Sequence, residues 1–150
     1  MSSSYVPTRS TLAARVGVPE RSIEAARELG RWARAQGEPG LALAVWEGCA
    51  ALDDAPASWL EVAELALVVG DAARAWDAAV RVASSPTVDR EARAAATLLF
   101  ARVCLFLGRR DEASAWLASV RDDVGEPGRL ARALEAAIAL EMRPHPAGPP

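Results

Sequence analysis

The stretch from residue 56 to residue 86 has the pattern of two short amphipathic helices joined by a tight turn. Apolar residues before the turn recur at helical spacing, at Trp59, Val62, Leu65, Ala66 and Val69. Gly70 can adopt the left-handed backbone conformation that ends a helix, and Asp71 can cap the helix that follows. Two helices this short cannot bury their apolar faces alone, so they need similar units on both sides. The stretch therefore predicts a protein built from helical repeats.

Two more glycines occupy the position of Gly70 in the neighbouring sequence. Gly37 lies 33 residues before Gly70 and Gly108 lies 38 residues after it, and each follows an apolar helical pattern. Five residues beyond each of the three glycines stands a small residue: Ala42, Ala75 and Ala113. This spacing predicts three helix–turn–helix units in phase.

Composition favours the same fold class. Hydrophobic residues make up 51% of the 150 residues but aromatic residues only 5%, so the expected core consists largely of Ala, Leu and Val. Alanine is the best helix former, and its small side chain lets helices approach closely. Runs of β-branched and aromatic residues that would indicate strands are missing. The sequence predicts an all-α domain.

A repeat of about this length with these small residues and turn glycines resembles the tetratricopeptide repeat. The bulky residue that opens the family's first helix is met by Trp59, and its Leu-Gly pair by Leu29-Gly30. Pro56 and Pro86 fit the proline that closes the family's repeat. The resemblance implies an α-solenoid of three repeats followed by a C-terminal capping helix.

The domain limits follow from this resemblance. A repeat domain is expected over residues 19–143, with repeats at about 22–56, 57–87 and 88–122 and the capping helix at about 129–143. Residues 1–18 would form a flexible N-terminal segment with a short helix over 10–16, and residues 144–150 a Pro-rich disordered tail. Two Gly-Glu-Pro-Gly sequences, at 37–40 and 125–128, predict turns before helices that begin at Leu41 and Arg129.

A narrower resemblance concerns the join between the first two repeats. Trp46, the run from Cys49 to Asp53, and Trp59-Leu60 resemble the corresponding segment of class II type III secretion chaperones. Residues 134–140 are similar to that family's closing helix. The resemblance implies a small, acidic, cytoplasmic protein that holds hydrophobic translocator proteins before their export. The alternative is a generic repeat scaffold or adaptor in a bacterial multiprotein or regulatory complex.

The tetratricopeptide geometry implies a concave groove lined by the first helix of each repeat. Carried over to this chain, the groove positions are Glu24, Arg27, Arg31 and Arg34, then Leu60, Glu64, Leu67 and Val68, then Leu98, Arg102, Leu105 and Phe106. Such a groove would be basic at one end and apolar elsewhere, and would hold a peptide or helix segment of a partner protein. The alternative for these leucines is that they pack against neighbouring helices. The chain has no Lys or Asn, which argues against the repeat proteins that bind a chaperone's C-terminal carboxylate.

Other classes of function find little support. A net charge of −3 argues against nucleic-acid binding, and the most apolar run, 94–107, contains Arg102 and is too short to span a bilayer. Cys49 and Cys104 lack metal-ligand spacing and are expected to be buried thiols, while the single histidine, His145, lies in the Pro-rich tail. The sequence therefore predicts no catalytic residues, metal or cofactor, and a protein partner. It leaves open whether the chain forms a homodimer.

Overall fold

The computed structural model describes residues 10–141, which contain eight α-helices and no strand. The all-α fold class is thereby confirmed. The helices are α1 (Leu12–Val16), α2 (Glu20–Ala35), α3 (Pro39–Asp53), α4 (Pro56–Val68), α5 (Ala72–Ser84), α6 (Arg90–Phe106), α7 (Arg110–Val120) and α8 (Glu126–Glu141). The expectations for residues 1–9 and for the tail at 144–150, including His145, fall outside the described residues.

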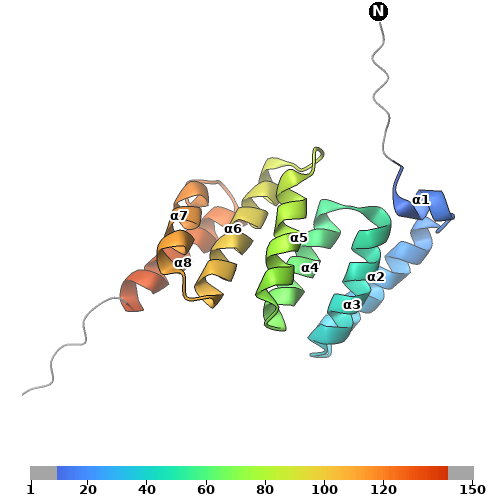
Figure 1. Ribbon diagram of the computed structural model, residues 1–150, viewed down its shortest axis with the longest axis horizontal. Coiled ribbons are helices and arrows are strands. Elements are labelled where there is room, and N and C mark those ends of the chain that lie inside the picture. Colours follow the sequence, from blue (N-terminus) through green and yellow to red (C-terminus); the bar gives the residue numbers. More distant parts are fainter. Residues whose placement is uncertain (1–9, 142–150) are drawn as a thin grey trace, which may run out of the picture.

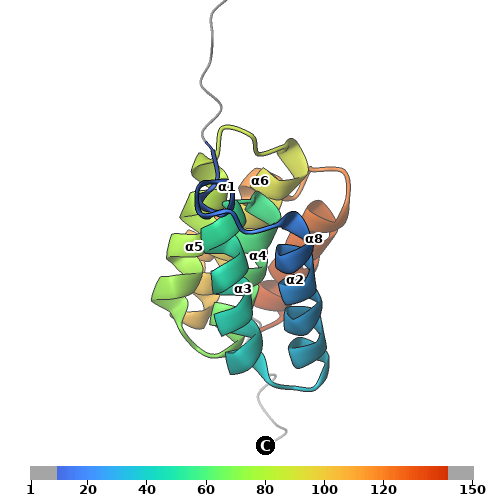
Figure 2. The ribbon, with the colours of Figure 1, turned by 90° about the vertical axis from the view of Figure 1, so that its right-hand side faces the viewer.

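The helices follow one another along the long axis of the molecule in chain order (Figure 1). From α2 onward each helix packs against the next, while α4 also packs against α6, and α6 against α8. The short α1 packs against α3. Seen along the long axis, α2 and α8 lie on one side of the molecule and α3 and α5 on the other (Figure 2). The chain thus forms neighbouring helix pairs in two layers.

The three turn glycines have the backbone conformation that the sequence predicts. Gly37, Gly70 and Gly108 have φ angles of 77°, 84° and 74°, in the left-handed region that favours glycine. The Asp71 carboxylate accepts a hydrogen bond from the Arg74 backbone N–H at 2.9 Å, as a helix N-cap does. Local chemistry therefore sets these helix ends.

The two Gly-Glu-Pro-Gly sequences contain helix starts, and this corrects the prediction that they are only turns. Helix α3 begins at Pro39 and α8 at Glu126, so the predicted starts at Leu41 and Arg129 are too late. The first turn of a helix leaves its N–H groups without partners inside the helix. A proline there loses no hydrogen bond, and its fixed φ suits the helix.

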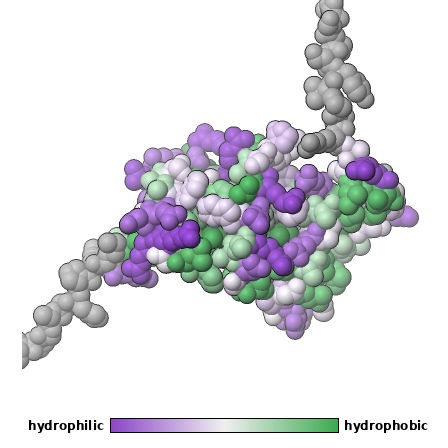
Figure 3. All heavy atoms as spheres, in the orientation of Figure 1, coloured by the Kyte–Doolittle hydropathy of each residue, from purple (hydrophilic) through white to green (hydrophobic). Residues whose placement is uncertain are grey.

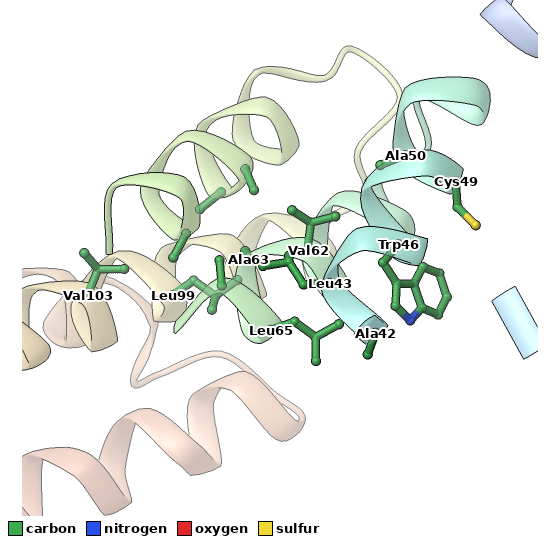
Figure 4. Packing of buried hydrophobic residues seen from close by; sticks show 14 of the residues in the cluster. Ala42, Leu43, Trp46, Cys49, Ala50, Val62, Ala63, Leu65, Leu99 and Val103 are labelled. Carbon is green, nitrogen blue, oxygen red and sulfur yellow. The ribbon is translucent and has the colours of Figure 1, made fainter. Parts of the chain in front are cut away.

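The core consists of two clusters of buried side chains. The larger is formed by α1 to α6. In Figure 4, Leu43 of α3 lies next to Val62 and Ala63 of α4, while Trp46 and Cys49 project from the other side of α3. The smaller is formed by α6, α7 and α8. Trp116 packs against both clusters, and its ring centroid lies 5.0 Å from that of Phe100 and 6.4 Å from that of Trp76. The aromatic rings therefore join the two clusters into one core.

Gly30 allows a close approach between α2 and α3. A Cβ atom at Gly30 would lie 2.6 Å from Nε1 of Trp46, which projects from α3. The buried Trp46 N–H has no hydrogen-bond partner among residues 10–141. Glycine stands at this position of the predicted Leu-Gly pair because the indole occupies the space that a side chain would need.

Candidate protein-binding groove

A hollow with a volume of about 460 Å³ lies between α4, α6 and α8. We refer to it as the α4–α6–α8 groove. Its apolar lining consists of Leu60 from α4, Ala92, Ala95, Leu98 and Leu99 from α6, and Pro127 and Leu130 from α8. Its charged lining consists of Glu64, Asp89, Glu91 and Glu126.

The apolar floor of the groove follows from where α6 begins. The Asp89 carboxylate accepts a hydrogen bond from the Ala92 backbone N–H at 2.7 Å and caps the helix. Ala92, Ala95 and Leu99 then recur three and four residues apart, which places them on one side of α6. Because the two alanine side chains are short, they leave space above α6 between α4 and α8.

Leu60 and Leu130 form the apolar walls of the groove. Leu60 is half-buried and packs against the larger core cluster, and Leu130 is 40% exposed. Leu98 is only 5% exposed because it belongs to the smaller core cluster with Leu117 and Ala131. Leu98 is therefore mainly a core residue, which is the alternative that the sequence left open for these leucines.

Carboxylates surround this apolar floor, and no basic side chain lines the groove in the part of the chain that the structure describes. Glu64 accepts a hydrogen bond from the Arg102 guanidinium, and Glu126 lies 3.1 Å from the exposed guanidinium of Arg129. Glu91 is exposed, and none of the ion pairs among residues 10–141 includes it. The rim therefore carries negative charge next to an apolar surface.

The structure brings three of the predicted groove residues together, Leu60, Glu64 and Leu98, with Arg102 beside Glu64. The remaining apolar candidates lie nearer the C-terminal ends of the same helices: Leu67, Val68, Leu105 and Phe106. At 1.5 Å per residue, Val68 lies about 12 Å along α4 from Leu60. Val68 and Phe106 are more than half exposed, while Leu67 and Leu105 are half-buried. These four residues do not line the groove.

The three arginines of α2 that the sequence predicts in the groove, Arg27, Arg31 and Arg34, are paired with carboxylates. Arg34 lies 2.7 Å from Glu61 of α4, and Arg31 lies 2.7 Å from Glu28 and 2.6 Å from Glu24. Hydrogen bonds to the carboxylates of Glu28 and Glu24 raise the pKa of Arg31. The expected basic end of the groove is thus neutralised by neighbouring acidic side chains, and none of these arginines lines the groove.

Arg27 contributes to a junction between three helices. Its guanidinium lies 2.7 Å from the Asp53 carboxylate at the end of α3, and hydrogen bonds to Glu24 and Asp53 raise its pKa. Asp53 also accepts hydrogen bonds from the Ser58 hydroxyl of α4 at 2.7 Å and from the Ala55 backbone N–H at 2.8 Å. The Asp53 side chain is 9% exposed. Arg27 is therefore a structural residue that joins α2 to the start of α4.

The two cysteines are buried thiols, and burial raises the pKa of each. Cys104 borders a second hollow of about 400 Å³ beside Trp76, yet both thiol residues are only 1% exposed. Over residues 10–141, no three His, Cys, Asp or Glu side chains are grouped so that they could hold a metal ion. Within the same range, every helix is too short or too polar to cross a membrane.

Helix α8 contributes Glu126, Pro127 and Leu130 to the groove, a contribution that the sequence does not predict. The sequence predicts a turn at Pro127 and a capping helix that contains Leu130, and it predicts neither residue in the groove. The available signal was the spacing of Leu130, Leu134 and Ile138, four residues apart, because it marks an apolar side of α8 that faces the preceding helices.

Comparisons of the chain with protein-family models, with curated proteins and with solved structures found no match.

Proposed function

We propose that this chain is a non-catalytic protein-binding module that holds a peptide or helix segment of a partner in the α4–α6–α8 groove. The observation that carries this proposal is an apolar surface that stays open between three helices. Leu60, Leu130 and the small side chains of α6 line it. Grooves lined by apolar side chains can take up the apolar face of a partner's amphipathic helix.

We further propose that the helix pairs are three tetratricopeptide-like repeats, α2 with α3, α4 with α5 and α6 with α7, capped by α8. Two observations support this. The predicted small residues Ala42, Ala75 and Ala113 are fully buried, as close helix packing requires. Gly30 provides the close approach between α2 and α3 that the Leu-Gly pair suggests.

The finer proposal is a cytoplasmic chaperone for hydrophobic translocators of a type III secretion system. Its supports are the resemblance from Trp46 to Leu60 and the open apolar groove. Asp53, which closes the resembling run, fixes α4 through Ser58 and thereby the helix that carries Leu60. A chaperone of this kind needs an apolar surface that replaces the contacts its client lacks before assembly.

A second apolar surface favours the alternative of a scaffold or adaptor. Leu12 and Val16 of α1 are 44% and 60% exposed at the N-terminal end of the molecule, where Figure 3 shows apolar surface. Leu29 and Trp32 of α2 are also about half exposed. An adaptor needs two separate binding surfaces, and this end is distinct from the α4–α6–α8 groove.

The test uses two charged substitutions in the groove walls, Leu60→Asp with Leu130→Asp, and affinity capture from the native cell extract with mass spectrometry of the bound chains. Leu98 is excluded because a charge at this buried position would unfold the protein. Leu140→Asp on the same helix α8 is the control, since Leu140 is exposed and lies outside the groove.

We expect the double variant to lose its partner while the control keeps it, with unchanged circular dichroism in both. Capture of the same partner at the wild-type level by the folded double variant would overturn the proposal. A translocator among the bound chains would favour the chaperone proposal. A regulatory or structural protein among them would favour the adaptor proposal.

A further inference from the structure

The charged side chains that line the groove favour an occupant of opposite charge. Carboxylates from α4, from the start of α6 and from the start of α8 surround the apolar floor, and no lysine or arginine of the described chain lines it. Resting on the proposed function, we propose that the occupant is an amphipathic helix with an apolar face flanked by basic side chains.

The shape of the groove fits a helix. Its floor runs along α6 from Ala92 to Leu99, which at 1.5 Å per residue is about 10 Å, or two helical turns. The side chains of Ala92 and Ala95 leave room above the floor, and Leu60 and Leu130 form the two sides. An amphipathic helix lays apolar residues at i, i+3, i+4 and i+7 into a groove of this kind.

The carboxylates occupy positions that basic flanking residues of such a helix can reach. Glu91 is exposed, and no ion pair among residues 10–141 engages it, so its charge is free to act on a partner. Glu64 has one guanidinium partner, Arg102, and Glu126 has an exposed contact with Arg129. Arginine and lysine have long apolar stems that follow an apolar surface while their charged ends stay in water.

The same charges disfavour an acidic occupant. Like charges facing each other across an interface repel, and this excludes competing partners. Asp89 and Glu126 also stabilise the ends of their own helices, but Glu64 lies within α4, where it has no such role. The carboxylates at the rim therefore favour basic occupants over acidic ones, while the floor supplies the apolar contact.

The first experiment selects a displayed library of random 14-residue peptides on the full chain. Peptides that also bind the Leu60→Asp, Leu130→Asp variant are removed. We expect the enriched peptides to combine apolar residues at helical spacing with a net positive charge. Enrichment of neutral or acidic peptides would overturn the charge proposal and leave the binding function standing. If no peptide is enriched over the variant, both proposals are wrong.

The second experiment tests the rim with the best enriched peptide. Glu91→Arg is compared with Glu112→Arg, because both glutamates are exposed in the first turn of a helix, Glu91 in α6 and Glu112 in α7. The two reversals disturb their helix dipoles alike, but only Glu91 lines the groove.

Binding is measured by fluorescence anisotropy at low and high salt. We expect Glu91→Arg to weaken binding about 3- to 10-fold at low salt, and less at high salt, since screening reduces interactions between exposed charges. Glu112→Arg should stay within about 2-fold of the wild type. Equal effects of the two reversals, or an affinity that does not depend on salt, would overturn the proposal.

Discussion

Gly40 and Gly128 occupy the same place in two identical Gly-Glu-Pro-Gly sequences, yet their surroundings differ. A Cβ atom at Gly128 would lie 2.0 Å from the Asp123 carbonyl oxygen, whereas one at Gly40 would meet nothing within 4 Å. Both residues are in the first turn of a helix, α3 and α8 respectively. Gly128 therefore has a steric requirement that Gly40 lacks.

Alanine at these two positions should have opposite effects. We expect Gly128→Ala to lower the free energy of unfolding by about 1–3 kcal/mol or more, because backbone must move to admit the methyl group. Gly40→Ala should leave it unchanged or raise it by up to about 1 kcal/mol, since alanine favours helix. Urea unfolding followed by circular dichroism measures both values. Similar values for the two variants would contradict the close contact at Gly128.

The identical tetrapeptides also show what a sequence can and cannot reveal about one residue. The positive φ at Gly70 was predictable because a helix end and the following cap are local features. The contact at Gly128 depends on the loop around Asp123, and the burial of Leu98 depends on Leu117 and Ala131. These distant partners are set by helix packing, which no local pattern records.

At the scale of helices, Asp53 holds α2, α3 and the start of α4 together. Its carboxylate accepts hydrogen bonds from Arg27 and Ser58, and Ser58 is a buried polar side chain. Removing the carboxylate would leave both donors without this acceptor, and unpaired buried polar groups are costly. The junction therefore links the first helix pair to the start of the second.

Asp53→Ala should accordingly lower the free energy of unfolding by about 2–4 kcal/mol. Glu28→Ala is the control, because Glu28 pairs with Arg31 on the exposed side of α2 and should cost less than about 1 kcal/mol. Guanidinium unfolding of both variants against the wild type gives the comparison. An Asp53→Ala variant as stable as the Glu28→Ala variant would show that the junction is dispensable.

The ion pairs along α2 should give this helix a pH-dependent stability. Hydrogen bonds from Arg27 and Arg31 lower the pKa of Glu24 from its ordinary value of 4.5. A carboxylate with a lowered pKa in the folded state contributes stability above its unfolded pKa and loses it as pH falls through the folded value. We expect stability to fall below about pH 4.5, and to fall less steeply in Glu24→Gln. Thermal unfolding between pH 3 and 6 measures this, and identical slopes in both proteins would contradict it.

The groove could be predicted in part at the scale of helices. The structure brings Leu60, Glu64 and Leu98 beside one another because the first helices of successive pairs, α4 and α6, lie next to each other. The arginines of α2 were predicted to line a basic end, but Asp53 and Glu61, carboxylates that pair with them, come from α3 and α4. The pairs of Arg31 with Glu24 and Glu28 lie within α2 and could be read from the sequence, but a pattern of charges on one helix does not reveal which carboxylates the next helices bring to it.

At the scale of the whole molecule, the question is whether the two core clusters unfold together. Stacked helix pairs contact only their neighbours, so their two halves can in principle unfold separately. Trp116 joins the clusters here, with its ring next to those of Phe100 and Trp76. We expect this aromatic contact to make residues 10–141 unfold as one unit.

The two cysteines report on this, since Cys49 belongs to the larger cluster and Cys104 lies in α6, the helix that contributes to both clusters. Both are 1% exposed, and burial raises the pKa of each thiol, so neither should react with a thiol reagent in the folded protein at pH 8. We expect Cys49→Ala and Cys104→Ala each to leave one thiol that becomes reactive only on unfolding. The reactivity of each remaining thiol is measured at increasing urea concentration. After correction for the difference in stability between the two variants, we expect both thiols to become reactive at the same urea concentration. Earlier exposure of Cys104 than of Cys49 would mean that α6 to α8, and with them the groove, can open while the N-terminal helices stay folded.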